Sequence, residues 1–494
     1  MAPPFVALAW TVRVGYSRKC VDFARTRVTR RRPGCVFHRE LIKTPIMGPR
    51  LALPRIALLV TLLFGNVHAL DDGSAPFYES VTAADHSSAQ NAMAFQVLLT
   101  SYVNTSGARC LDGSPGNYYF RQGTGDGALK WYIHHQGGGW CENMDDCLSR
   151  SRGHLGSSQH DGKTMQLRGG YFDPSPAVNP MMHDWNVVFM RYCDGGSFSG
   201  NNETAPLYKN TTLYFRGKRI REAVYDSLKA LHRMGAATDV VISGCSAGGL
   251  ATFLHTDQWC DALARDAPGV KCVGLPDSGF FLDFEDARRV KHAGGGGRQL
   301  DTISGNYHSG LKWVFEMMNT SAGLNQDCVA AKASGGASVD AATYLCQFAE
   351  HTSVFTHTPL FALQSEYDSW QTGHVLYYPN TGADVAALGR NLTQRITANL
   401  LGPHPRSGVF LDSCWHHCGM WDQIRIDGEL VSTAFQKWYE GLGARGEDVP
   451  IKRTWKQGLP FRCYGCCYPD ERAAEGKLAW EVSRSSTELA RSVA

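Results

Sequence analysis

The chain has 494 residues, of which 43% are hydrophobic and 19% are charged, with a formal net charge of +3. The near balance of acidic and basic residues argues against nucleic acid as the main ligand. The hydrophobic content is sufficient for the core of one large domain, which we place at residues 75–470 and expect to be a monomer, followed by a polar tail at residues 471–494.

Two segments precede this domain. Residues 1–46 are rich in arginine and poor in acids, and we interpret them as sequence upstream of a true start at Met47 or, alternatively, as an organelle-targeting extension. Residues 47–69 predict a secretory signal peptide, because a basic flank precedes an apolar core that is too short to span a bilayer. We therefore expect secretion to the extracellular space or cell wall, with no stable membrane insertion of the mature protein.

A strand is predicted at Lys130–His135, and Gln136 and three consecutive glycines follow it. A glycine run after a strand lets backbone N–H groups face a ligand without obstruction by side chains. In α/β-hydrolases such amides form an oxyanion hole together with the amide of the residue after the nucleophile. A flexible loop is the alternative for the glycines taken alone.

Further strands and one helix continue the pattern. Strands that alternate with helices indicate a mostly parallel sheet flanked by helices. Residues 284–350 are interpreted as an insertion over the sheet that shapes a substrate cleft. The amphipathic helix is placed at Gly217–Met234, and its core face carries Ile220, Val224, Leu228 and Leu231. The strands are placed at Asn186–Met190, Lys271–Leu275, Pro359–Gln364 and Gly408–Asp412.

The run from Asp239 to Gly249 contains a Gly-x-Ser-x-Gly element centred on Ser246. An apolar, β-branched stretch precedes this element, and a helix is predicted at Gly249–Asp257. A serine on a sharp strand-to-helix turn presents its hydroxyl at a helix N-terminus, which favours developing negative charge. Ser246 is therefore the candidate nucleophile, and the alternative is a turn whose serine only caps the helix.

Two later strands end in residues that complete a catalytic triad. Asp368 follows one strand, and the adjacent histidines His416 and His417 follow the next. This is the chain order of nucleophile, acid and histidine that α/β-hydrolases use. Glu366 and Asp412 compete with Asp368 for the role of the acid.

With these motifs, the chain resembles the pectin acetylesterase family, whose animal branch contains the Notum-like carboxylesterases. The likeness covers roughly residues 95–467 in family order and is closer to the plant-type enzymes. The matching segments are Gln136–Cys141, Arg191–Phe198, Phe215–Arg219, Ser243–Leu250, Asp277–Asp283, Tyr367–Gln371 and Asp412–Cys418.

The resemblance implies a serine esterase with Ser246 as nucleophile, Asp368 as acid and His417 as base. His417 is selected over its neighbour because it lies three residues after a cysteine and directly before another, as the family's histidine does.

The resemblance also places the oxyanion amides, at Gly139, Trp140 and Ala247. The family usually has an acidic residue where this chain has Gln136, a change that we expect to affect substrate preference rather than the chemistry. Aromatic residues that border the motifs are interpreted as substrate contacts or as core, and those chosen as substrate contacts are Tyr192, Trp370 and Trp415.

The cysteines favour an oxidising compartment. Two of the 16, Cys20 and Cys35, lie in the N-terminal extension, and the other 14 occur between Cys110 and Cys467. An even number of cysteines after a signal peptide indicates a disulfide-stapled domain. Asn-x-Ser/Thr triplets agree with this route and occur at Asn104, Asn202, Asn210, Asn319 and Asn391.

Spacing indicates two short staples, Cys141–Cys147 and Cys260–Cys272, and Cys245 is expected to be a buried thiol or part of a disulfide. A cluster of cysteines and histidines near the candidate base also allows a zinc site. We favour the interpretation without metal, because secretion and the triad account for the same residues, and we expect no cofactor. The cluster contains Cys414, His416, His417, Cys418, Cys463, Cys466 and Cys467.

These observations predict a secreted serine esterase that removes O-acetyl groups from cell-wall polysaccharide, with acetylated pectin as the expected substrate. Two alternatives remain open. One is a Notum-like lipid deacylase, which needs a deep apolar pocket for the acyl chain. The other is a catalytically silent relative that binds glycan or protein, against which the complete triad argues.

Overall fold

The computed structural model describes residues 92–284, 307–334, 342–376, 380–443, 452–462 and 467. All of them belong to one of two compact units of the chain, Gly73–Ala494. The predicted N-terminal extension, the predicted signal peptide and the predicted polar tail lie outside the described residues. The boundaries of the domain at residues 75–470 stay a prediction.

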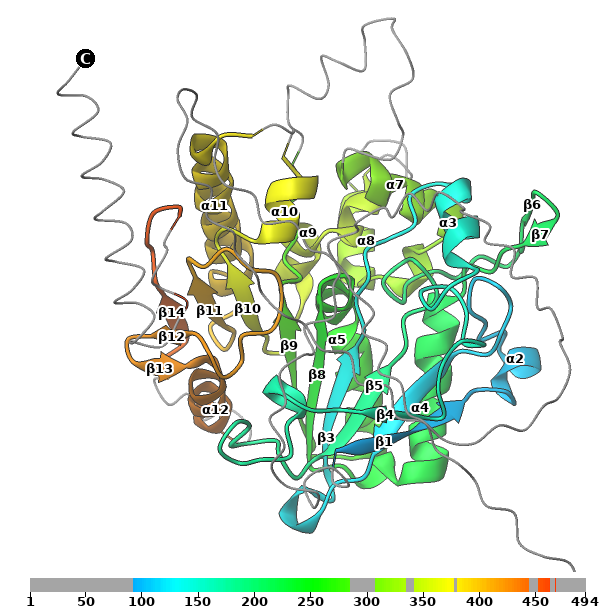
Figure 1. Ribbon diagram of the computed structural model, residues 1–494, viewed down its shortest axis with the longest axis horizontal. Coiled ribbons are helices and arrows are strands. Elements are labelled where there is room, and N and C mark those ends of the chain that lie inside the picture. The colour runs from blue at the N-terminus through cyan, green and yellow to red at the C-terminus, as the bar shows by residue number, and fades with distance from the viewer. Residues whose placement is uncertain are drawn as a thin grey trace, which may run out of the picture. The chain divides into compact units, whose positions relative to one another are not determined.

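A ten-stranded sheet runs through this unit (Figure 1). The strand order is β14-β11-β10-β9-β8-β3-β5-β2-β1-β4; the seven strands from β14 to β5 are parallel, and β2, β1 and β4 are joined antiparallel. Helices flank this sheet, which confirms the predicted α/β-hydrolase-like class. The strands are β1 (Met93–Leu98), β2 (Asn117–Arg121), β3 (Lys130–His135), β4 (Thr164–Gln166), β5 (Asn186–Met190), β8 (Asp239–Cys245), β9 (Lys271–Asp277), β10 (Phe361–Ser365), β11 (Gly408–Asp412) and β14 (Thr454–Lys456).

The two faces of the sheet are buried in separate hydrophobic cores, because alternate residues of a strand point to opposite faces. Val240 and Ile242 of β8 lie in the same core as helix α5 (Ala247–Asp266). Val241 lies in the other core, together with helix α12 (Val431–Gly441). Burial on both faces explains why the strand reads as a continuous apolar run in the sequence.

Helix α4 (Gly217–His232) follows the prediction at its start but not at its end. The first three predicted core residues are buried, whereas Leu231 is 63% exposed. The chain turns just after the helix at Arg233, where φ is 61°, and Met234 is buried in the core instead. The expected core position of Leu231 was therefore wrong, because the amphipathic pattern continues past the last turn that packs on the sheet.

The region interpreted as an insertion is helical where it is described. Tyr307, the first residue of α7, has ring contacts with Trp140 and Trp370, so this region reaches the glycine loop. Its helices are α7 (Tyr307–Met318), α8 (Gln326–Ala333) and α9 (Ala349–Thr352). The remaining named elements are α2 (Tyr102–Thr105), α3 (Met144–Arg150), α10 (Ser369–His374), α11 (Gly382–Ile396) and the short strands β6 (Leu207–Tyr208), β7 (Thr211–Thr212), β12 (Arg425–Ile426) and β13 (Glu429–Leu430).

Six disulfides join cysteines of the described chain, and they confirm the prediction of a disulfide-stapled domain. Both expected staples are present, and Cys245 is in a disulfide rather than a buried thiol. Three cysteines of the cluster considered for zinc are likewise in disulfides, and Cys463 and Cys466 lie outside the described residues. The pairs are Cys110–Cys193, Cys141–Cys147, Cys245–Cys418, Cys260–Cys272, Cys328–Cys346 and Cys414–Cys467.

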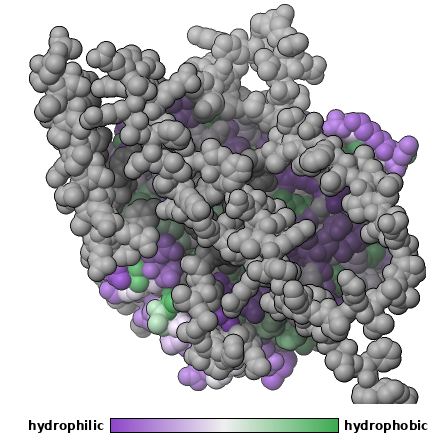
Figure 2. All heavy atoms as spheres, viewed as in Figure 1, coloured by the Kyte–Doolittle hydropathy of each residue, from purple (hydrophilic) through white to green (hydrophobic). Residues whose placement is uncertain are grey.

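The described helices include none that is long and apolar enough to cross a membrane. On the face drawn in Figure 2, the hydrophobic residues of the described surface lie in small areas between hydrophilic ones. Large exposed hydrophobic side chains of the described residues are few; Phe95 and Leu98 both belong to β1, the others are scattered, and one of these, Trp415, is 57% exposed. Isolated residues of this kind are ordinary on a protein surface, unless they lie beside a site.

Candidate active site

Ser246 occupies a strained turn between β8 and α5. Its backbone has φ 61° and ψ −125°, a region that residues with a side chain rarely adopt. The Ser246 N–H donates to the backbone carbonyl of Asp277 on the neighbouring strand, at 3.0 Å. Strain of this kind persists only where the surroundings hold it, and it is typical of a nucleophile elbow.

The glycines of the elbow are required by close backbone contacts. A Cβ atom on Gly244 would lie 2.2 Å from the carbonyl oxygen of Gly248, and one on Gly248 would lie 2.0 Å from that of His135. Both distances are far below contact. The Gly-x-Ser-x-Gly pattern therefore lets the start of α5 rest directly on the end of β3, beside the glycine loop.

The loop after β3 is held by its carbonyl groups. The Gly138 carbonyl accepts from Nη1 of Arg150 at 2.7 Å, and the Gly139 carbonyl accepts from the Tyr192 hydroxyl at 2.7 Å. Gln136 accepts from the backbone N–H of Tyr192 at 3.0 Å. Among the described residues no acceptor binds the N–H groups of Gly139 and Trp140. The loop is thus fixed with two amides available for a ligand.

Ser197 connects this loop to the elbow, and no sequence pattern predicted a role for it. Its hydroxyl accepts from the indole N–H of Trp140 at 2.7 Å and donates to the carbonyl of Ala247 at 2.7 Å. The only sequence signal for it was its place in the segment Arg191–Phe198. Ser197 sets the spacing between the two halves of the predicted oxyanion hole.

The three aromatic residues predicted as substrate contacts differ in position. Tyr192 is fully buried and supports the glycine loop through its hydroxyl, so we interpret it as a support of the loop rather than a substrate contact. Trp370 is partly buried and stacks on His374 at 4.4 Å between ring centroids. Trp415 is mostly exposed, and its indole N–H donates to Thr372 at 3.2 Å.

Asp368 and His417 form a close pair. Nδ1 of His417 lies 2.9 Å from Oδ2 and 3.0 Å from Oδ1 of Asp368. The carboxylate also caps α10, accepting from the backbone N–H groups of Trp370 and Gln371. Nε2 of His417 is buried and has no hydrogen-bond partner among the described residues. Asp368 therefore fixes the orientation of the imidazole through Nδ1, and Nε2 is available to bind another group.

The competing acids bind elsewhere. Asp412 pairs with Nε2 of His416 at 3.1 and 3.2 Å, whereas Glu366 accepts from the hydroxyls of Thr393 and Ser413. Burial alone would lower the pKa of His416, but Asp412, with smaller contributions from Asp277 and Asp368, raises it to about 9. The adjacent histidines thus have separate carboxylates, and Asp412 favours the protonated form of His416.

The loop that carries His417 is tied to the end of β9. Ser278 accepts from the N–H of Cys418 at 2.8 Å, and the carboxylate of Asp277 accepts from the N–H of Gly419 at 2.9 Å. Burial raises the pKa of Asp277 to about 6, against the opposing effect of the bond from Gly419. Asp277 therefore contacts both halves of the site, since its backbone carbonyl also holds Ser246.

Aromatic rings fill the space beside His417. Phe281 lies 6.1 Å from the imidazole between ring centroids, and it packs on Trp140 at 5.0 Å, Trp370 at 5.1 Å and Tyr307 at 5.7 Å. Phe281, Trp140 and Tyr307 are almost completely buried. This cluster, which we call the aromatic wall, packs directly beside the histidine.

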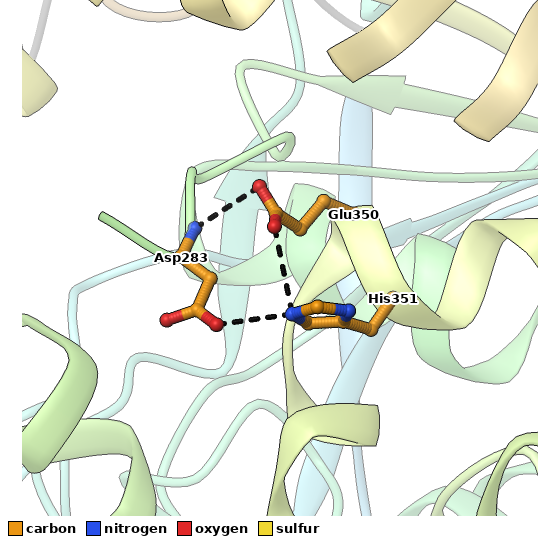
Figure 3. Close-up of side chains that lie close together, drawn as sticks. All are labelled: Asp283, Glu350 and His351. Atoms are coloured by element: carbon orange, nitrogen blue, oxygen red, sulfur yellow. Dashed lines mark hydrogen bonds and ion pairs between the residues drawn. The ribbon is translucent and has the colours of Figure 1, made fainter. Parts of the chain in front are cut away.

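A polar cluster follows directly after the aromatic wall in the chain. Asp283, Glu350 and His351 offer ligand atoms within 4.8 Å of one another, an arrangement that could hold a cation (Figure 3). In the structure they bind each other: Nε2 of His351 lies 3.0 Å from Oδ2 of Asp283, and Glu350 accepts from the Asp283 N–H at 3.3 Å. His308 bonds the other oxygen of Asp283. These contacts join the segment after β9 to α7 and α9, and the expectation of no metal stays a prediction.

Comparison with known proteins agrees with this architecture. The pectinacetylesterase family matches residues 87–455. Pectin acetylesterase 5 of Arabidopsis thaliana is 31% identical over 396 residues, which cover 75% of this chain and 84% of the relative. Pectin acetylesterase 4 of the same plant is 30% identical over 393 residues, with 75% and 87% covered. Human palmitoleoyl-protein carboxylesterase NOTUM is 31% identical over 191 residues, 38% of this chain and 37% of that protein.

The strained serine, the parallel sheet and these relatives together define a carboxylic ester hydrolase with an α/β-hydrolase-like fold. The family match extends over most of the chain, from the first described strand to the last. The chain belongs to the pectinacetylesterase family.

Proposed function

We propose that this protein is a secreted serine esterase that hydrolyses O-acetyl esters of cell-wall polysaccharide, with acetylated pectin as its substrate. The observation that carries the proposal is the state of His417. Its Nδ1 is held by Asp368, and its buried Nε2 has no partner among the described residues. A general base needs an oriented ring and a nitrogen that can accept a proton; the Ser246 hydroxyl does not bind this nitrogen in the structure, and in the proposal the bond forms when substrate binds.

In the proposed mechanism, Nε2 of His417 takes the proton from the Ser246 hydroxyl as its oxygen attacks the ester carbonyl. The amides of Gly139, Trp140 and Ala247 stabilise the oxyanion, and each lowers the activation barrier by on the order of 3 kcal/mol. His417 then protonates the leaving sugar hydroxyl, and water releases acetate from the serine by the same sequence of steps. This route requires no cofactor.

The aromatic wall supports a short acyl group. Phe281 is fully buried and in contact with three other rings beside His417. A long acyl chain would have to displace these packed rings, whereas an acetyl group requires only a small space. A palmitoleoyl deacylase is therefore the less favoured assignment.

The exposed side of the histidine loop supports a sugar substrate. Trp415, two residues before His417, offers a flat apolar face that a pyranose ring can cover. The guanidinium carbon of Arg462, an exposed residue, lies 5.9 Å from the centroid of this indole. A cation beside a stacking surface favours an anionic sugar such as a uronic acid over a neutral one.

The disulfides support the proposal that the protein is secreted. Six disulfides in the described chain fit an oxidising compartment such as the cell wall or the extracellular space. The signal peptide predicted at residues 47–69 would deliver the protein there.

The test is the release of acetate from acetylated pectin and acetylated xylan by the secreted protein, with octanoyl and palmitoleoyl esters measured in parallel. We expect acetate from pectin, little hydrolysis of the long-chain esters, and a loss of at least about 10³-fold in Ser246→Ala. Preference for the long chains would assign lipid deacylation instead. Folded protein without activity on any of these esters would identify a binding relative.

A further inference from the structure

A disulfide links the two chemically central segments of the site. Cys245 directly precedes Ser246, and Cys418 directly follows His417; their Cα atoms lie 5.8 Å apart, although 173 positions separate them in the chain. One half comes from the end of β8 and the other from the loop after β11. A single covalent bond therefore joins the backbone segments of the proposed nucleophile and the proposed base.

The histidine loop needs such a restraint. Residues 413–420 contain neither helix nor strand. Cys418 and Met420 have φ of 60° and 66°, values that residues with a Cβ atom adopt only where their surroundings hold them. The bonds to Asp277 and Ser278 hold the backbone of this loop, and the disulfide is its covalent connection to the elbow.

This disulfide is also partly accessible. Of the six disulfides between described cysteines, it is the one in which neither cysteine is buried. Each of the other five has at least one cysteine that is no more than 8% exposed. Accessibility is a main determinant of how fast a thiolate attacks a disulfide, so this pair is expected to be reduced before the disulfides in which both cysteines are buried.

We propose that the Cys245–Cys418 disulfide is a positioning element of the esterase site and its redox switch, an inference that rests on the proposed role of Ser246. Intact, the disulfide holds His417 in register with the serine. A dithiol reductant opens it: one of its thiolates attacks a sulfur, releases one cysteine thiolate and forms a mixed disulfide with the other cysteine; its second thiol then attacks the reductant sulfur of that bond, releasing the second cysteine thiolate and leaving the reductant as a cyclic disulfide. Two electrons and two protons pass to the protein, which is left with two cysteine thiols.

Reduction leaves most of the site intact. The Asp368–His417 pair and the bonds from Cys418 and Gly419 to the end of β9 do not involve the sulfurs. The imidazole therefore stays paired with Asp368, but no covalent link then fixes the distance between the histidine loop and the serine. A misplacement of a reacting group by about 1 Å can cost on the order of 10²-fold in rate. We expect kcat to fall about 10- to 100-fold while KM changes little.

The first experiment compares two double variants of the full secreted protein. Cys245→Ala/Cys418→Ala removes the proposed element, and Cys260→Ala/Cys272→Ala removes a disulfide that also has one partly exposed cysteine. We expect the kcat for 4-nitrophenyl acetate to fall about 10- to 100-fold in the first variant and to stay within about twofold of wild type in the second. Wild-type kcat in the first variant would overturn the positioning role.

The second experiment uses the wild-type protein, so it does not depend on the folding of a variant. Mild treatment with dithiothreitol is followed by alkylation and mass spectrometry, and activity is measured at each time. Loss of activity in step with alkylation of Cys245 and Cys418, and its return with glutathione disulfide, supports the switch. Full activity with these two thiols alkylated overturns it. If Ser246→Ala keeps its activity, the proposed function fails instead, irrespective of the disulfide.

Discussion

The nucleophile elbow and the histidine loop are held in place by different means. The elbow lies between a strand paired on both sides and a 20-residue helix, and backbone contacts at Gly244 and Gly248 define its path. The loop at residues 413–420 has no regular structure and depends on the side chains of Asp277 and Ser278 and on two disulfides, one from Cys414 and one from Cys418. The sheet therefore sets the position of the serine, whereas side chains set the position of the base.

The same contrast separates the two adjacent histidines. His416 pairs with Asp412, four residues earlier, so both members of this pair lie at the end of one strand and in the loop that follows it. His417 is directed to Asp368, which comes from the turn after another strand. We interpret the local pair as a support of the loop, and the pair that joins two strand ends as part of the proposed site. The predictions below test this division.

The largest effect is expected for Asp368→Asn. The amide would still fit the cap of α10, but it would hold the imidazole in the wrong tautomer, with the proton on the nitrogen that must accept from the serine. We expect kcat to fall about 10³- to 10⁴-fold. Acetate release under saturating substrate measures this.

The matched control for that variant is Asp412→Asn, which makes the same chemical change at the neighbouring histidine. We expect it to lower kcat by no more than about tenfold, since His416 has no role in proton transfer in the proposed mechanism. Equal losses in the two variants would mean that the two pairs act as one unit, and the division between them would be abandoned.

The elbow and the strands were predictable because their signals are local. The bounds of β3, β5 and β11 match the predicted strands, and the Gly-x-Ser-x-Gly run has the turn conformation that its glycines require. Local patterns identified Asp368 and His417 only as candidates among several. Their selection came from the family resemblance, and the pairing observed in the structure agrees with it.

The remaining features depend on contacts between distant segments. The order of the strands in the sheet is what brings these segments close enough to touch. The contacts that depend on it include Cys245 with Cys418, Ser197 with Ala247, and Asp277 with Gly419. No periodicity or spacing within one segment encodes such a contact. For the same reason the burial of Tyr192 and the exposure of Leu231 were not foreseen, because each depends on what packs against it.

A smaller effect is expected from the charge of His416, and it appears in stability rather than in rate. The folded-state pKa of about 9 exceeds the ordinary value of 6.5, because three carboxylates outweigh the cost of burial. The protonated pair therefore stabilises the fold below pH 6.5, and this contribution is lost as the pH rises to about 9. At roughly 1.4 kcal/mol per pKa unit, the loss is up to about 3 kcal/mol.

Urea unfolding with intact disulfides at pH 6.5 and pH 9 measures this change, and His416→Gln is the control. The variant should be less stable than wild type at pH 6.5, and the difference between the two should shrink at pH 9. A difference that is the same at both pH values would show that His416 stabilises the loop by packing and hydrogen bonding rather than by its charge.

The smallest effect is expected on the exposed side of the histidine loop, at Arg462. The segment that carries it is tied to the loop, since the Leu459 N–H donates to the Ser413 hydroxyl at 2.9 Å. An exposed cation beside Trp415 contributes about 1 kcal/mol or less to the binding of an anionic sugar. Arg462→Gln should therefore raise KM for acetylated pectin about three- to fivefold, with kcat unchanged and with no effect on acetylated xylan.

Arg265→Gln is the matched control, because Arg265 is an exposed arginine in the last turn of α5, roughly 28 Å along the helix from Ser246. The control should leave KM for pectin unchanged. The effect of Arg462 should also disappear in about 0.5 M salt, since salt screens exposed charges. An equal rise of KM for pectin and xylan would mean that Arg462 only orients the indole of Trp415, and the loop would then bind sugars by stacking, without selecting their charge.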